Sequence, residues 1–416
     1  MSMAASIFPA SPQITEHAVM TNTLSNPPAN IFPELRIKGK SLLPIVQGGM
    51  GVGISASRLA GTVARAGGVG TLSSVDLRRH HPDLLSQTVK SRDKDLINRL
   101  NLLALDREVR NACEMADGHG LVSVNIMRAV SEYANNVRQS CESGAAAIVV
   151  GAGLPLDLPD LTAAYPDVAL IPILSDSRGI AIVLKKWMRK SRLPDAIIIE
   201  HPRMAGGHLG AASIADLDSP RFDFPRVLDE TFAVFKLLGI EREQIPLIPA
   251  GGINTPQQVQ TLFAQGAGAV QIGTPFAVTE ESDAHPNFKR VLAEAEPEDI
   301  ITFMSVAGLP ARAVNTPWLE RYLAKLPVLQ QRANPRSGCT LAFDCLAQCG
   351  LRDGIARFGQ FCIDHHLAAA LAGDIERGLF FRGAAPLPFG KHIRPVKDLI
   401  NYLLRGIIPD NLVPAI

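Results

Sequence analysis

The sequence predicts a parallel α/β barrel of the TIM type, followed by a mainly helical C-terminal region. From residue 44 to about 279, short apolar runs alternate with segments of helical pattern. The runs are almost continuously apolar, as expected of parallel strands covered on both faces. Eight strand–helix units over roughly 235 residues fit this barrel in number and length. A doubly wound open sheet is the alternative prediction.

The predicted elements follow in regular order along the chain. The strands are predicted at 44–49, 69–74, 121–126, 145–150, 168–174, 195–200, 245–252 and 269–273. Helices are predicted near 55–68, 78–118, 129–142, 179–191, 225–238 and 256–264. In the first helix, Leu59, Val63 and Ala66 recur at helical spacing, and Gly67 stands at the expected C-terminus.

The chain divides into three predicted parts. Residues 1–40 are rich in Ser, Pro, Asn and Thr and are expected to form a flexible leader, and 41–280 form the barrel. The remainder, 281–416, is expected to be mainly helical, with helices over 318–332 and 351–380 and a loop over 305–318.

The composition excludes several classes of partner. Formal net charge is +1, without a long basic or acidic block, so neither nucleic acid nor an anionic membrane surface is expected as a partner. No run of about 18 apolar residues predicts a membrane span. Six cysteines in 416 residues are too few for a disulfide scaffold and favour a reduced, cytoplasmic protein.

Glycines follow the last two predicted strands. A bound phosphate needs backbone N–H donors and close approach, which glycine permits because it lacks a Cβ. Gly251 and Gly252 precede an N-cap at Asn254 or Thr255, and Gly273 with Thr274 follows the eighth strand. The loops after strands seven and eight are the usual phosphate site of this fold.

Two further polar residues lie at predicted strand ends. Asn125 ends the third strand, where it either caps a turn or bonds a ligand. His208 stands in "MAGGHLG" after the sixth strand, where Gly206 and Gly207 let the backbone approach a flat ligand. A lone histidine is often a plain loop residue, but one in this position can donate, accept or carry charge beside an anion.

These motifs together resemble the nitronate monooxygenase family, also called 2-nitropropane dioxygenases. The resemblance runs from about residue 41 to 316 through "PIVQGGMGVGISASRLAGTVARAGGVGTL", "AGGH", "IPAGGI" and "QIGTPFAVTEES". It implies a TIM barrel that binds FMN non-covalently and a catalytic role for His208. The residues that it implies for FMN binding are Gly48, Gly49, Met50, Asn125, Gly206, Gly207, Gly251, Gly252, Gln271, Ile272, Gly273 and Thr274.

The implied reaction is the oxidation of an alkyl nitronate by oxygen to a carbonyl compound and nitrite. The sequence departs from the family at His201, Met204 and Leu209, where the family carries glutamine, glutamate and arginine. These departures make the pocket less polar than usual. An NAD(P)H-dependent quinone or enoyl reductase, or a non-catalytic flavin-binding barrel that docks a partner, are the alternatives.

Four cysteines lie close together in the C-terminal region. Cys339, Cys345, Cys349 and Cys362 form the pattern C-x5-C-x3-C-x12-C, which lacks the C-x2-C spacing of common zinc and ferredoxin sites. The sequence therefore favours buried thiols and no metal, with zinc or an iron–sulfur cluster as the alternative.

Overall fold

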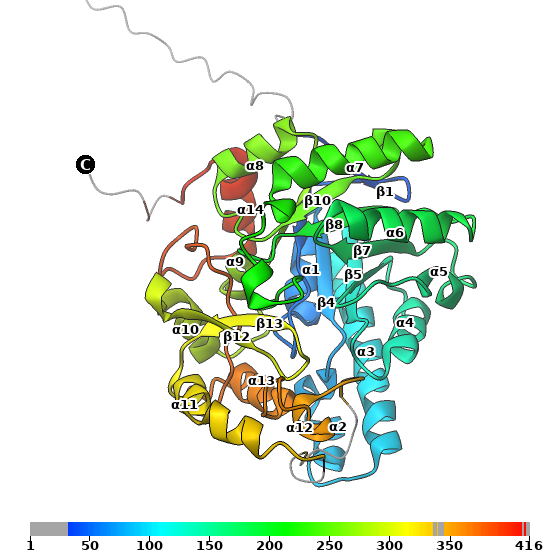
Figure 1. Ribbon diagram of the computed structural model, residues 1–416. Coiled ribbons are helices and arrows are strands. Elements are labelled where there is room, and N and C mark those ends of the chain that lie inside the picture. The colour runs from blue at the N-terminus through cyan, green and yellow to red at the C-terminus, as the bar shows by residue number, and fades with distance from the viewer. Residues whose placement is uncertain (1–31, 336–338, 340–344, 410–411, 413–416) are drawn as a thin grey trace, which may run out of the picture. The chain divides into compact units, whose positions relative to one another are not determined.

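The eight predicted strands form a closed parallel barrel in the computed structural model, which describes residues 32–335, 339, 345–409 and 412. The strands neighbour one another in chain order, and the last one pairs with the first, so the doubly wound alternative is excluded (Figure 1). They are β3 (Ile45–Gln47), β4 (Val69–Ser73), β5 (Leu121–Met127), β6 (Ala147–Gly151), β7 (Ala169–Leu174), β8 (Ile197–Glu200), β10 (Leu247–Ala250) and β11 (Val270–Ile272).

Helices follow the barrel strands at the predicted places, and two short helices, the fifth and the ninth, are additions that the sequence did not predict. The helices are α1 (Ser57–Arg65), α2 (Pro82–Thr88), α3 (Lys94–Ala116), α4 (Tyr133–Glu142), α5 (Leu158–Leu161), α6 (Ser177–Met188), α7 (Phe224–Leu238), α8 (Pro256–Ala264) and α9 (Thr274–Ala277). The hydroxyl of Thr255 caps α8 by accepting a hydrogen bond from the N–H of Gln258, as the sequence predicts. In the described part of the chain, no helix has the length and hydropathy needed to cross a membrane.

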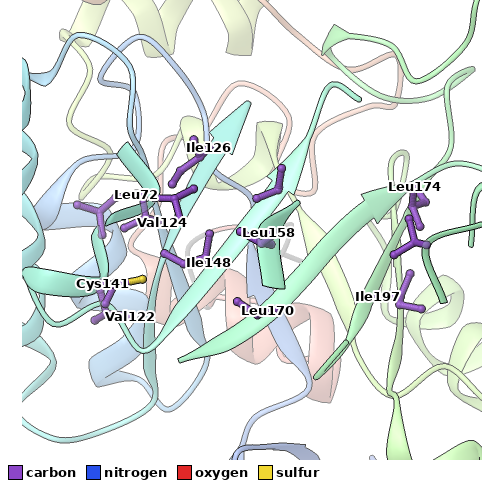
Figure 2. Packing of buried hydrophobic residues seen from close by; sticks show 14 of the residues in the cluster. Leu72, Val122, Val124, Ile126, Cys141, Ile148, Leu158, Leu170, Leu174 and Ile197 are labelled. Atoms are coloured by element: carbon purple, nitrogen blue, oxygen red, sulfur yellow. The ribbon is translucent and has the colours of Figure 1, made fainter. Parts of the chain in front are cut away.

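Side chains of the barrel strands alternate between two apolar layers. Val46, Val149 and Ile198 belong to the layer inside the barrel. Val124 and Ile148 belong to the layer between the strands and the outer helices (Figure 2). Both faces of each strand are therefore buried, which explains the continuous apolar runs in the sequence.

A short hairpin precedes the barrel. Strands β1 (Leu35–Ile37) and β2 (Lys40–Leu42) pair antiparallel, and Leu35, Ile37 and Leu42 pack with the inner barrel layer. The expected flexible leader, 1–40, lies mostly outside the described residues.

The C-terminal region adds a small sheet and further helices. The sheet consists of β9 (Gly207–His208), β12 (Ile300–Met304) and β13 (Pro310–Val314), in the order β12-β13-β9. The expected loop over 305–318 is therefore wrong in part, because β13 lies within it. The helices are α10 (Pro286–Glu294), α11 (Pro317–Gln331), α12 (Gly350–Asp353), α13 (Ile363–Leu371) and α14 (Val396–Arg405) (Figure 1).

Helix α14 completes the ring of helices around the barrel. Its buried residues Leu399, Ile400 and Leu403 pack in one cluster with Ile45 of β3 and Val270 of β11. It also packs against α8 and α9. The helix that covers the last strand is thus supplied by the end of the chain, and residues between α9 and α14 extend over the mouth of the barrel.

Candidate active site

A cavity of about 650 Å³ opens at the carboxyl ends of the barrel strands, where enzymes of this fold bind their ligands. The structure brings all the residues predicted for cofactor or substrate binding to this one cavity. They are Gly48, Gly49, Met50, Asn125, Gly206, Gly207, His208, Gly251, Gly252, Gln271, Ile272, Gly273 and Thr274. These residues come from the ends of five separate strands, so closure of the barrel is what brings them together.

At two glycines of the cavity wall, the surrounding packing leaves no room for a side chain. A Cβ on Gly49 would lie 2.3 Å from the Cβ of Asn125. A Cβ on Gly252, whose φ is +76°, would lie 2.8 Å from the Cβ of Met204. Gly273 differs, since a Cβ there would meet no protein atom within 4 Å. The wall is thus close-packed behind Gly49 and Gly252, and open at Gly273.

Two buried polar atoms of the cavity lining have no hydrogen-bond partner among the described residues, the Oε1 of Gln271 and the Oδ1 of Asp364. The Oε1 atom of Gln271 is inaccessible to solvent and accepts no hydrogen bond. Gln271 follows the inner-layer residue Ala269 by two positions and so faces the inside of the barrel. An unmet buried amide is costly, and a flat ligand with an N–H or carbonyl edge would satisfy it.

His208 is held by the C-terminal sheet. Strand β9 pairs with β13, so that His208 lies opposite Ala311 and Gly207 opposite Arg312. The His208 Nε2 lies 2.7 Å from the Oγ of the buried Ser305, which itself accepts a hydrogen bond from the N–H of Ala307. Burial lowers the pKa of His208 to about 4, so the imidazole is neutral at pH 7.

A buried arginine fixes the loop before His208. The Arg312 guanidinium donates a 2.6 Å hydrogen bond to the carbonyl of Ala205 and a 3.4 Å bond to that of Pro202. Sequence reasoning did not identify Ser305 or Arg312, because both lie about a hundred residues from the loop that they hold.

Glu200 is a second titratable group that the sequence analysis did not select. It ends β8 and lines the cavity. It follows the inner-layer residue Ile198 by two positions, and its carboxylate has no ion-pair partner among the described residues. Burial raises its pKa to about 7. A charged residue at the end of an apolar barrel strand was the available signal.

The three departures from the family pattern have different surroundings. His201 packs edge-on against Phe224, outside the cavity lining, with its Nε2 3.6 Å from an Asp223 carboxylate oxygen. Met204 and Leu209 both line the cavity and add apolar surface to it. Two apolar side chains therefore line the cavity that also contains His208.

Substitution of Gly206 by alanine should destabilise the fold by about 1–3 kcal/mol. The new Cβ would lie 2.5 Å from the backbone carbon of Arg382 and from the backbone nitrogen of Gly383, which cannot rotate away as a side chain can. Urea unfolding measures the effect. Gly179→Ala, in α6, is the control, since the nearest atoms to the new Cβ lie 3.5 Å or more away. Equal stability of the two variants would contradict the clash.

The fold and the cavity define a TIM-barrel enzyme that takes its ligand at the carboxyl ends of the strands. The chain belongs to the nitronate monooxygenase family, whose sequence model matches residues 36–406. This confirms the resemblance found in the motifs and makes the protein an oxidoreductase.

Similar proteins agree with this assignment. A probable nitronate monooxygenase of Bacillus subtilis is 26% identical over 289 residues, which cover 67% of this chain and 78% of that protein. A putative nitronate monooxygenase of Saccharomyces cerevisiae is 32% identical over 128 residues, 29% of this chain and 30% of that protein.

Two solved structures share the fold. FabK from Thermotoga maritima has a TM-score of 0.58 at 22% identity, with 87% of this chain and 91% of that chain covered. A nitroalkane oxidase from Streptomyces ansochromogenes has a TM-score of 0.55 at 20% identity, covering 87% and 94% of the two chains. At these identities the similarity supports the barrel, not a substrate.

Proposed function

We propose that the protein binds FMN and uses oxygen to oxidise alkyl nitronates to a carbonyl compound and nitrite. The observation that carries the proposal is the convergence of a glycine-lined wall, the unpartnered amide of Gln271 and a neutral His208 on one cavity. Membership of the nitronate monooxygenase family supports this reaction class.

The cavity residues fit a flavin. Gly48, Gly49 and Met50 offer a flat backbone surface for a ring system, and the Gln271 amide can hydrogen-bond the polar edge of the pyrimidine ring. Gly273 provides space for a phosphate beside the loops after β10 and β11. When bound, the flavin supplies the redox chemistry, while the protein binds and orients the substrate.

His208 suits an anionic substrate. A neutral imidazole can donate a hydrogen bond from one ring nitrogen while Ser305 holds the other, and it adds no charge that would trap the product. A bound nitronate would raise the pKa of His208, since a nearby negative charge stabilises the imidazolium. The apolar surface of Met204 and Leu209 favours an alkyl substituent on the nitronate.

Glu200 would extend the substrate range of the enzyme to neutral nitroalkanes. Its carboxylate lines the same cavity as His208 and has a pKa of about 7, which suits a general base at neutral pH. It would accept the proton from the carbon beside the nitro group, and the resulting nitronate would then be oxidised.

Substitution of Gly273 by alanine should weaken FMN binding at least about tenfold, because the methyl group fills space reserved for the phosphate. The same change should leave the apo fold intact, since the Cβ meets no protein atom within 4 Å. Flavin titration of the apoprotein measures the affinity, and circular dichroism checks the fold. Unchanged affinity would remove Gly273 from the cofactor site.

The main test uses the purified protein. We expect a flavin absorption spectrum, release of FMN on denaturation, and oxygen consumption with nitrite formation when an alkyl nitronate is added. Rapid flavin reduction by NADPH without oxygen, with no turnover of nitronate, would instead support a quinone or enoyl reductase. Failure of the apoprotein to bind any flavin would contradict the whole proposal.

A further inference from the structure

Helix α13 forms one wall of the cavity that contains His208. Ile363, Asp364, Leu367 and Ala370 line the cavity from this helix, and their spacing places them on one helical face. Three of these four side chains are apolar, so Asp364 is the charged group that α13 presents to the cavity. Neither the proposed FMN binding nor the proposed oxidation of a nitronate uses this carboxylate.

A buried network of ion pairs holds the Asp364 carboxylate in place. Its Oδ2 accepts a 2.9 Å hydrogen bond from the Nη2 of Arg79. The Nε of Arg79 donates to Asp76, which also accepts a 2.7 Å hydrogen bond from the Nε of Arg78. Asp76, Arg78 and Arg79 do not line the cavity. The network therefore fixes the Asp364 carboxylate from behind the cavity wall.

The second oxygen of this carboxylate lacks a donor. The Asp364 side chain is only 2% exposed, and its Oδ1 has no hydrogen-bond partner among the described residues. Burial, and next the negative charge of Asp364, raise the pKa of Asp76 to about 7. Above pH 7 Asp76 is therefore mainly ionised and has no proton to donate to Asp364. A ligand that donates a hydrogen bond would satisfy this buried oxygen, which is unfavourable when left alone.

We propose that Asp364 determines substrate specificity, and that its Oδ1 accepts a hydrogen bond from a hydroxyl group on the alkyl part of the substrate. The inference rests on the proposed oxidation of nitronates and adds the class of nitronate, one with a hydroxyl group away from the nitro carbon. A hydroxyl suits the site better than an ammonium group. The two aspartates and two arginines of the network balance in formal charge, so an ammonium group would leave a buried net charge.

Phe381 connects the surroundings of Asp364 with those of His208. The ring centroids of Phe381 and His208 lie 5.7 Å apart. Phe381 also packs against the same apolar cluster as Leu367, which follows Asp364 by one helical turn. All four residues line one cavity. A nitronate with its anionic end at His208 would thus extend its alkyl part past Phe381 and Leu367 toward Asp364.

The experiment is calorimetric titration of the full-length protein without oxygen, at a pH well above 7, where Asp76 is ionised. The ligands are preformed nitronates of terminal nitroalcohols of increasing chain length. Each is paired with the nitronate in which a methyl group replaces the hydroxyl. We expect one nitroalcohol nitronate to bind about 10- to 100-fold more tightly than its methyl counterpart, as a hydrogen bond to a charged group allows. Pairs of other lengths should differ less, because their hydroxyl group does not reach Oδ1.

The Asp364→Asn variant tests the acceptor directly. The amide oxygen can still accept a hydrogen bond from Arg79, while the amide nitrogen replaces the acceptor Oδ1 with a donor. The preference for the hydroxyl should disappear, and the methyl counterparts should bind almost as they bind the wild-type protein. Asp374→Asn is the matched control and should keep the wild-type preference. Asp374 also pairs with an arginine, Arg377, but lies outside the cavity lining.

Three results would overturn the inference. The first is equal affinity within every pair for the wild-type protein, a measurement that does not depend on how the variants fold. The second is a hydroxyl preference that survives in Asp364→Asn. The third is release of flavin from Asp364→Asn but not from Asp374→Asn, which would assign Asp364 to the cofactor. A hydroxyl preference in binding without nitrite formation in oxygen would contradict only the proposed function, and binding of no nitronate at all would contradict both.

Discussion

Replacement of His208 by asparagine should slow nitronate oxidation by about 10²–10⁴-fold while the flavin stays bound. Asparagine is too short to reach Ser305 as the His208 Nε2 does, but the backbone pairing of β9 with β13 does not depend on this side chain and is expected to survive. The substitution removes the imidazole, which can take up a proton as the anion binds. Oxygen uptake with a preformed nitronate gives the rate, and absorbance gives the flavin content.

The matched control is His119→Asn, which alters an exposed histidine whose ring bonds the carbonyl of Ala116 outside the cavity. This variant should oxidise nitronates at the wild-type rate. If His208→Asn also kept the wild-type rate with full flavin content, His208 would be a structural residue of the loop and the proposed role would be wrong.

The barrel was predictable because its signal is local. Each strand is covered on both faces, so runs such as "DAIIIE" and "VALIPIL" are apolar at nearly every position, whatever lies elsewhere in the chain. The caps are local too, as the capping of α8 by Thr255 shows. Since the carboxyl ends of barrel strands meet at one mouth, the glycines at four strand ends could be assigned to one site.

The support of His208 was not predictable, because it depends on long-range pairing. Strand β9 contains two residues and has no periodicity of its own, and its partner β13 lies about a hundred residues later. Ser305 and Arg312 acquire their roles only through this pairing. The same limit applies to α14, whose amphipathic pattern predicts a helix but not the strands that it covers.

Glu200 presents an intermediate case. Its position at the end of an apolar strand is visible in the sequence, but its lack of an ion-pair partner and its raised pKa come from the surrounding barrel. An exposed glutamate at the same place would titrate near 4.5 and would be too weak a base at neutral pH. The structure therefore identifies Glu200 as a candidate general base, which its position in the sequence alone does not.

Replacement of Glu200 by glutamine should lower the turnover of a neutral nitroalkane by about 10²-fold or more and leave the oxidation of its preformed nitronate nearly unchanged. Glutamine has the same shape but cannot accept the proton from carbon, whereas the preformed nitronate has already lost it. Measurement of nitrite release from both substrates, corrected for flavin content, separates the two steps. Glu142→Gln on α4, away from the cavity lining, is the control.

The pH dependence distinguishes a base from a residue that only shapes the cavity. Glu200 accepts a proton only when ionised, so kcat/KM for the neutral nitroalkane should rise with pH up to about 7 and level off above it. His208, with a pKa of about 4, stays neutral near pH 7 and so adds no second change to the pH profile of kcat/KM. In Glu200→Gln the rise should disappear, because the titrating group is gone. A variant that was slow but kept the wild-type pH profile would show that another group removes the proton, and that Glu200 acts through the shape of the cavity alone.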